Sequence, residues 1–222
     1  MKIANLNIEY GDKKIFSDFG IEFEKNKVTA ILGSSGIGKT TILRAISSLV
    51  DYSGEISEVG KISYVFQESR LIPTMTVKQN LLYVAQSNKE EFWEKAKVLL
   101  DKYGLAEEEN TFPDELSGGM ASRVGLIRAF LTESDTILLD EPFRFLDAKT
   151  REKLIKIVAE LLVDYKRTAI LVTHEPKESI TLADRIIVLG DRPAKVIMDV
   201  EVKKDLSDLE KLELEKKLLS AI

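Results

Sequence analysis

A glycine-rich stretch between an apolar run and a helix-spaced segment constrains this chain more than any other feature. The apolar run, Val28–Leu32, is partly β-branched and has the length of a short buried strand. After it the chain matches the pattern G-x-x-x-x-G-K-[ST], which begins at Gly33 and ends at Lys39 and Thr40. Apolar residues at positions 42, 43 and 46 then have the spacing of a helix. The stretch therefore predicts a strand, a tight loop and a helix, which is the context that this pattern requires.

The pattern is typical of loops that hold nucleotide phosphates. Glycines let the backbone curl so that successive N–H groups point at phosphate oxygens, and the start of a helix favours an anion. Lys39 would reach the β- and γ-phosphates, and the Thr40 hydroxyl would ligate Mg²⁺. The alternative is a glycine-rich turn with a surface lysine, but a chance match occurs on the order of once in a hundred chains of this length. We therefore expect the nucleotide to be bound by Gly33, Ser34, Ser35, Gly36, Ile37, Gly38, Lys39, Thr40 and Thr41.

Length and composition limit the remaining classes of protein. The 222 residues suit one α/β domain or at most two small ones, and 44% hydrophobic residues are enough for a core. No run reaches the roughly 18 apolar residues of a membrane span, and the amino terminus lacks the pattern of a signal peptide. The chain has no cysteine, which excludes disulfides and cysteine metal sites. The net charge of −5, with both signs interspersed, offers no basic nucleic-acid face, so we expect a soluble, cytoplasmic protein.

Two adjacent carboxylates follow a second apolar strand, predicted at Thr136–Leu139. Asp140 would hold the Mg²⁺ shell, and Glu141 would orient or deprotonate the attacking water. Acidic pairs also occur in solvated loops, but rarely directly after four apolar residues. The third such strand, Ala169–Val172, ends at Thr173 and His174. His174 is the only histidine, which excludes a multi-histidine metal site; it is either structural or acts at the γ-phosphate.

Two further polar or aromatic residues lie at predicted strand ends. Gln67 follows the predicted strand Lys61–Phe66, and the carboxyl ends of strands are where open α/β sheets bind ligands. The alternative is an ordinary surface glutamine. Tyr10 precedes the turn signal Gly11-Asp12 and could stack on an adenine ring, although aromatic residues in strands mostly serve packing.

Helical spacing dominates from Glu68 to about Thr132, and this region is predicted to be a helical subdomain inserted into the αβ core. Near its end, the run Leu116–Met120 opens a helix that continues to about Phe130. Ser117 is a good N-cap, but the two glycines that follow it lower helix propensity. The segment is either a simple capped loop or a place where bare backbone approaches an anion.

The remaining elements frame this core. We expect antiparallel strands at Ile3–Tyr10 and Ile21–Phe23, helices at Val77–Ala85 and Glu90–Tyr103, and closing strands at Ile186–Leu189 and Val196–Val200. The leucine-spaced segment Leu206–Ile222 is predicted to be a helix that packs on the core and has a solvated outer face.

Together these residues resemble the ATP-binding subunit of an ABC transporter over essentially the whole chain. Residues 33–40 match the Walker A loop and 136–141 the Walker B strand with its catalytic glutamate, while 116–120 match the signature motif. Gln67 resembles the glutamine loop, Asp147 the end of the D-loop, and His174 the switch histidine. Tyr10 resembles the adenine-stacking aromatic. The resemblance implies a P-loop NTPase of α/β class, with an ABC ATPase core, an antiparallel β subdomain and the helical subdomain at about 68–132 in one domain spanning 1–222.

The resemblance also implies a mechanism. Two cassettes would close two ATP molecules, with Mg²⁺, between the Walker A loop of one and Ser117, Gly118, Gly119 and Met120 of the other. Lys39, Glu141, His174 and Gln67 would form the catalytic group, and Thr40, Gln67 and Asp140 would hold the metal. Hydrolysis would reopen the dimer, and the glutamine loop would carry the motion to an integral-membrane permease. Three departures from the common pattern are Met120, Ser122 and the pair Arg144-Phe145. Met120 is a variant that the family uses, Ser122 leaves the polar contacts of its turn open, and the bulky Phe145 leaves the geometry of the dimer seam open.

The segments Leu71–Val77 and Phe112–Ser117 resemble the corresponding segments of importer cassettes. The stretch Leu182–Leu189, with Arg192-Pro193 after it, looks most like cassettes of nitrate, sulfonate, taurine or thiamine-precursor importers. That branch implies a docking surface for the permease at Glu68–Leu82, a peripheral position on the inner face of the membrane, and an extracytoplasmic solute-binding protein. The partner cassette would be a second copy or a different one. The alternatives are an exporter-type cassette, a soluble ABC ATPase acting on nucleic acid or the ribosome, a nucleotide kinase and a non-catalytic binding module. The acidic balance and the single cassette argue against nucleic acid.

Overall fold

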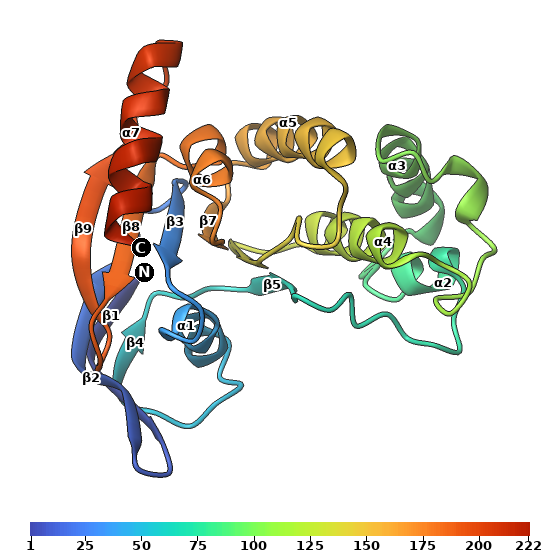
Figure 1. The fold of residues 1–222 in the computed structure, drawn as a ribbon. Helices are drawn as coiled ribbons and strands as arrows, with labels where there is room; N and C mark the ends of the chain where they lie inside the picture. Colours follow the sequence, from blue (N-terminus) through green and yellow to red (C-terminus); the bar gives the residue numbers. More distant parts are fainter.

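Two sheets organise the computed structural model, which describes residues 1–222 (Figure 1). The larger sheet has six strands in the order β5 (Ile62–Val65), β6 (Thr136–Asp140), β7 (Thr168–Val172), β3 (Val28–Gly33), β8 (Arg185–Gly190) and β9 (Lys195–Glu201). Its neighbours are parallel except for the antiparallel pair β8 and β9. The smaller, antiparallel sheet has the order β2 (Lys13–Glu22), β1 (Lys2–Tyr10) and β4 (Ser53–Ser57). The predicted α/β class with an antiparallel β part is confirmed.

The central strands are buried on both faces, so successive residues serve two different cores. Ile31 of β3 packs with α1 (Lys39–Ile46) and the smaller sheet, whereas Ala30 and Leu32 belong to the core on the opposite face. Figure 1 shows α1 on one side of the larger sheet and α5 (Ala148–Tyr165) and α6 (Pro176–Leu182) on the other. Because water touches neither face, the strands read as continuous apolar runs.

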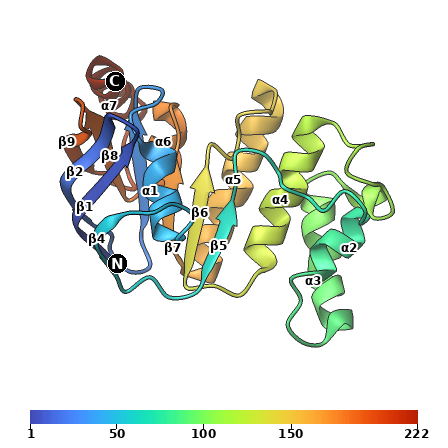
Figure 2. The ribbon, with the colours of Figure 1, turned by 90° about the horizontal axis from the view of Figure 1, so that it is seen from below.

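Only helices lie between β5 and β6: α2 (Val77–Leu82), α3 (Lys89–Lys102), the 3₁₀ turn η1 (Ala106–Glu108) and α4 (Gly118–Leu131). They form the end of the molecule opposite the smaller sheet (Figure 2). Leu81, Leu100 and Val124 bury their side chains where α2, α3 and α4 meet. That residues 68–132 form an inserted subdomain stays a prediction.

The smaller sheet differs from the predicted one in two ways. The strand predicted at Ile21–Phe23 is the end of a ten-residue strand, β2, which pairs with β1 through the turn at Gly11-Asp12. Three register shifts along this pair interrupt the alternation of apolar and polar residues, which hides the rest of β2 in the sequence. The edge strand β4 has no predicted counterpart, because its polar residues carry no apolar pattern.

The carboxyl-terminal helix, α7 (Asp208–Ala221), is present but packs less than predicted. Leu218 alone is buried on it, while Leu209, Leu212 and Leu219 are exposed, because its leucines are spread around the helix. Helices α5 and α6 lie where no element is predicted. None of the helices has the length and apolar character needed to span a membrane.

Candidate functional site

The phosphate-loop segment joins β3 to α1, as its pattern predicts, and it is folded closely against its neighbours. Gly33 has a φ of 150°, and a Cβ there would lie 2.7 Å from the Leu189 carbonyl oxygen of β8. Gly38 has a φ of 121°, and its Cβ would lie 2.8 Å from the Phe16 ring of β2. Both glycines are therefore required by the packing of the loop, in addition to the backbone curvature that the sequence suggested.

Lys39 begins α1 and is buried, and its side chain folds back over the loop. Its Nζ donates to the carbonyl oxygens of Gly33, at 2.7 Å, and Ser34, at 3.1 Å. Burial lowers the pKa of Lys39, and the nearby carboxylates of Glu141 and Asp140 oppose that shift. The lysine is thus held at the loop as a cation close to two acidic groups.

Asp140 ends β6 and faces the helix that follows the loop. The Thr40 hydroxyl donates to Asp140 Oδ1 at 2.8 Å, and the Tyr64 hydroxyl lies 3.4 Å from Oδ2. Burial raises the pKa of Asp140, an effect that the Thr40 hydrogen bond partly offsets. The structure has no group of three or more His, Cys, Asp or Glu residues that could hold a metal by themselves. One hydroxyl and one buried carboxylate nevertheless suit Mg²⁺, which usually takes one or two carboxylates together with phosphate oxygens and water.

Glu141 follows β6 and has a φ of 45°, a left-handed conformation that is strained for a residue with a side chain. The strain costs about 1–3 kcal/mol and is characteristic of functional positions. The Glu141 N–H donates to the Val172 carbonyl at 2.8 Å, which fixes the turn against β7. Its carboxylate lies between two partners: His174 Nδ1 is 3.4 Å from Oε1, and Arg144 Nη1 is 3.4 Å from Oε2.

The segment that carries His174 is held by a buried network that sequence reasoning missed. The Thr173 hydroxyl donates to Glu178 Oε2 at 2.6 Å and accepts from the Glu175 N–H at 3.1 Å. Burial raises the pKa of Glu178, and the Thr173 hydrogen bond opposes the shift. Arg151 of α5 reaches both glutamates, at 3.7 Å from Glu175 Oε1 and 4.0 Å from Glu178 Oε1. A threonine directly after a buried strand, with a glutamate in the first turn of the next helix, is the signal that could have revealed this contact.

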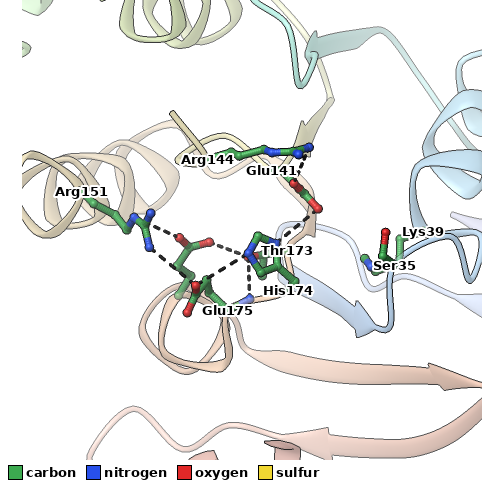
Figure 3. Close-up of a pocket in the computed structure, with 9 residues that line it drawn as sticks. Ser35, Lys39, Glu141, Arg144, Arg151, Thr173, His174 and Glu175 are labelled. Atoms are coloured by element: carbon green, nitrogen blue, oxygen red, sulfur yellow. Dashed lines mark hydrogen bonds and ion pairs between the residues drawn. The ribbon is translucent and has the colours of Figure 1, made fainter. Parts of the chain in front are cut away.

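Lys39, Glu141, His174 and the Thr173–Glu178 network meet in one cavity of about 320 Å³ whose lining has no hydrophobic residue (Figure 3). Thr40 and Asp140 are not among its lining residues. Its lining residues are Ser35, Lys39, Glu141, Arg144, Arg151, Thr173, His174, Glu175 and Glu178. The strand order explains the meeting, because β6, β7 and β3 are neighbours and their carboxyl ends open on the same edge. A polar cavity with converging cations and acids at this edge can bind a phosphate ester and activate water beside it.

The other predicted site residues do not line this cavity. Gln67 lies in a separate, narrow cavity with Ser122 and Pro142, the residue after Glu141. Tyr10 is at the exposed end of β1, with 49% of its surface accessible.

The signature residues lie at the start of α4, where the Ser117 hydroxyl oxygen accepts from the Met120 N–H at 3.2 Å. This confirms Ser117 as the predicted N-cap; of the two glycines after it, Gly118 is exposed and Gly119 is half-buried. Asp147 caps α5 by accepting from the Thr150 N–H at 3.0 Å.

A second network missed by sequence reasoning holds the segment after Gln67. The side chain of Asn80, fully buried in α2, bonds to the backbone of Ile72, Met75 and Thr76 at 2.8–3.1 Å. Arg128 of α4 donates to the carbonyl oxygens of Ser69 and Arg70, both at 3.0 Å. Two side chains therefore hold residues 69–76, the core of the predicted docking surface, in a defined conformation.

Comparison with known proteins identifies the relatives of this chain. The family model described as ABC transporter matches residues 16–144. The aliphatic sulfonates import ATP-binding protein SsuB 2 of Pseudomonas syringae pv. tomato is 35% identical over 86% of this chain and 85% of its own length. A protein of the same name from Streptomyces avermitilis is 37% identical over 85% of this chain and 76% of its own.

Solved structures agree with the fold. The dimeric ATP-binding cassette MJ0796, in a post-hydrolysis state with ADP and Pi, superposes with a TM-score of 0.79 at 26% identity, over 91% of this chain and 98% of that one. An ATP-binding subunit of an ABC transporter has a TM-score of 0.82 at 21% identity, over 99% and 97% of the two chains, which shows likeness of fold.

Proposed function

Because the chain belongs to the ABC transporter family of ATP-binding proteins, we propose that it is the ATP-hydrolysing subunit of an importer for sulfonates or chemically related small solutes. The chain is an ATPase and uses ATP together with Mg²⁺, as the cassettes of this family do. The sulfonate class rests on the names of its relatives, since this subunit does not itself touch the solute.

The observation that carries the proposal is the convergence of three strand ends on one polar cavity. In the proposed reaction, Lys39 and the backbone of residues 33–41 bind the phosphates. Thr40 and Asp140 would hold Mg²⁺, which supplies charge neutralisation of the phosphate oxygens, with Gln67 as a further ligand. Glu141 takes the proton of the attacking water, and His174 acts at the γ-phosphate. Tyr10 is the proposed stacking partner of the adenine.

The second half of the site comes from another cassette in this proposal. Ser117, Gly118, Gly119 and Met120 clasp the γ-phosphate held by the partner, and Asp147 lies at the seam between the two subunits. The exposure of Gly118 supports this, because a backbone N–H group at a helix start can then reach an outside anion. The partner is a second copy of this chain or a different cassette.

The proposed membrane partner is a permease whose cytoplasmic helix docks on Glu68–Leu82. The conformation imposed on residues 69–76 by Asn80 and Arg128 supports a surface of fixed shape there. The chain would then sit on the inner face of the membrane, and an extracytoplasmic solute-binding protein would act through the permease. An exporter-type cassette is the second candidate, and it differs in the membrane domain it would join.

The test is ATP turnover and mass of the wild-type and Glu141→Gln proteins, the latter by light scattering with and without ATP. We expect Glu141→Gln to lose turnover by at least about 10²-fold while still binding ATP and dimerising with it. Unchanged turnover would refute the assignment of Glu141 as the base. For the importer, charge reversal at Arg70 should reduce ATPase activity coupled to the permease, and intact coupling would contradict the docking surface.

A further inference from the structure

Arg144 lies in the turn that follows Glu141. Its Nη1 lies 3.4 Å from Glu141 Oε2, on the side of the carboxylate opposite His174, whose Nδ1 is 3.4 Å from Oε1 (Figure 3). We propose that Arg144 is a positioning residue that restrains the Glu141 carboxylate in the separate cassette and releases it when two cassettes meet. The inference rests on the proposed role of Glu141 as the base.

The turn holds the base of the Arg144 side chain in place. The Arg144 N–H donates to the Glu141 carbonyl at 3.2 Å, and the Leu146 N–H donates to the Phe143 carbonyl at 3.2 Å. Phe143 and Leu146 are buried and anchor the turn in the core. A cation three residues after Glu141 is therefore close to its carboxylate whenever this turn is formed.

The end of the Arg144 side chain is easily displaced. It is 47% exposed, while the Glu141 side chain is 18% exposed, and its other contact is a loose one, with the guanidinium 5.7 Å from the Phe145 ring. Arg151 in the same cavity is different, because it reaches two glutamates and is only 30% exposed. Of the two arginines, Arg144 is thus the one that can move without leaving several acids unpaired.

Restraint of Glu141 has a direct chemical consequence. A general base must orient a carboxylate oxygen toward the water it deprotonates, within hydrogen-bond reach. In this structure each oxygen of Glu141 already faces a side chain. The turn also touches the start of α4, because a Cβ on Gly119 would lie 3.2 Å from the Phe145 carbonyl oxygen. Residues of a second cassette that approach the exposed start of α4 therefore also reach the turn that carries Arg144.

The test compares Arg144→Ala, Arg144→Lys and wild type in steady-state ATP hydrolysis by the purified chain. An exposed ion pair shifts an equilibrium by up to about fivefold, so Arg144→Ala should raise kcat about two- to fivefold with KM for ATP unchanged. Arg144→Lys keeps the cation and should stay near the wild-type rate. Added salt screens such a pair, so the ratio of kcat for Arg144→Ala to kcat for wild type should approach one as the salt concentration rises to about 1 M. Lys149→Ala, which removes an exposed cation without an ion pair at the start of α5, should leave kcat unchanged.

Each other outcome overturns the proposal. A rate equal to wild type would show that the contact does not restrain Glu141, and a lower rate would show that Arg144 assists the reaction. An equal rise in Arg144→Lys or Lys149→Ala would point to loosening of the turn or to net charge. Glu141→Gln, measured alongside, separates this inference from the proposed function: if that variant turns over normally, the assignment of the base has failed instead.

Discussion

The Thr40 hydroxyl donates a 2.8 Å hydrogen bond to Oδ1 of Asp140, and this bond joins the first turn of α1 to the carboxyl end of β6, 100 positions later in the chain. Both groups are the ones that would hold Mg²⁺. The carboxylate is buried, so its charge is stabilised mainly by hydrogen bonds from Thr40 and Tyr64. Burial of the Asp140 carboxylate is therefore unfavourable for the stability of the free chain.

This gives a prediction for Asp140→Asn. Burial raises the pKa of Asp140 in the folded state, so the folded carboxyl retains its proton more strongly than the unfolded one, whose pKa is about 3.9. The stability that the protonated Asp140 carboxyl contributes to the folded state is therefore lost as pH rises from about 4 through the raised pKa. The amide of the variant does not ionise and still accepts from Thr40. We expect the variant to be more stable than wild type at pH 7 by on the order of 1 kcal/mol, and to lose Mg²⁺-dependent ATPase activity.

Urea unfolding without nucleotide at several values between pH 4 and 7 measures this difference, which should shrink toward pH 4. The matched control is Asp164→Asn on the exposed face of α5, which should change stability by less than about 0.5 kcal/mol. Lower stability of Asp140→Asn at pH 7 would contradict the argument.

The first two glycines of α4, Gly118 and Gly119, should respond differently to alanine. A Cβ on Gly118 would meet no atom within 4 Å, so Gly118→Ala should leave the chain as stable or raise its stability by about 0.4–1 kcal/mol. A Cβ on Gly119 would lie 3.2 Å from the Phe145 carbonyl and 3.3 Å from Leu146, so Gly119→Ala should destabilise the turn. Thermal melting of both variants, each in the Glu141→Gln background, tests this.

ATP-dependent dimerisation gives a second, independent test of Gly118. If position 118 needs a glycine so that its backbone can approach the phosphate held by the partner, Gly118→Ala should weaken ATP-dependent dimerisation without lowering the melting temperature. A variant that melts normally and dimerises normally would show that the position has no role at the seam.

The hydrogen bond from Thr173 to Glu178 predicts a large effect of a small substitution. Thr173→Val keeps the shape of the side chain but leaves a buried carboxylate without its 2.6 Å donor. Hydrogen bonds to charged groups are worth about 1.5–3 kcal/mol, so we expect a loss of about 2 kcal/mol in urea unfolding and lower ATPase activity through His174. Thr181→Val, an exposed threonine that bonds only within α6, is the control and should change stability by less than about 0.5 kcal/mol. Equal losses in the two variants would refute the special role of Thr173.

Contiguous features of the site could be predicted from the sequence, and features that join distant segments could not. The ends of β3, β6 and β7 were predictable because two-sided burial makes each strand an unbroken apolar run followed by polar residues. That these three strands are neighbours depends on pairing across more than 100 residues, which no local pattern encodes. The same reason hides the close approach of Gly33 to Leu189 of β8. The contact of Glu178 with Thr173 spans only five residues, so a local signal, a threonine after a buried strand and a glutamate in the next helix, could have revealed it. Strand β4 is hidden because its polar residues carry no periodicity.

Arg128 offers a last prediction, on how the cassette would transmit motion. Its guanidinium donates to the carbonyl oxygens of Ser69 and Arg70 and holds them against α4, and burial lowers its pKa without preventing these bonds. Arg128→Met keeps much of the apolar contact but removes both donors. Residues 69–76 should then sample more conformations, so trypsin should cleave after the exposed Arg70 several-fold faster than in wild type.

Arg123→Met is the matched control, because Arg123 lies on the same helix but donates to the Tyr103 carbonyl on the side of α3. We expect Arg128→Met to retain the ATPase activity of the isolated chain and to lose most of its stimulation by a permease, whereas Arg123→Met keeps both. The reason is that no residue from 69–76 lines the polar cavity of Lys39, Glu141 and His174, while the proposed docking surface is built from them. If the two variants lose stimulation equally, fixing this segment is not how the cassette couples to its partner.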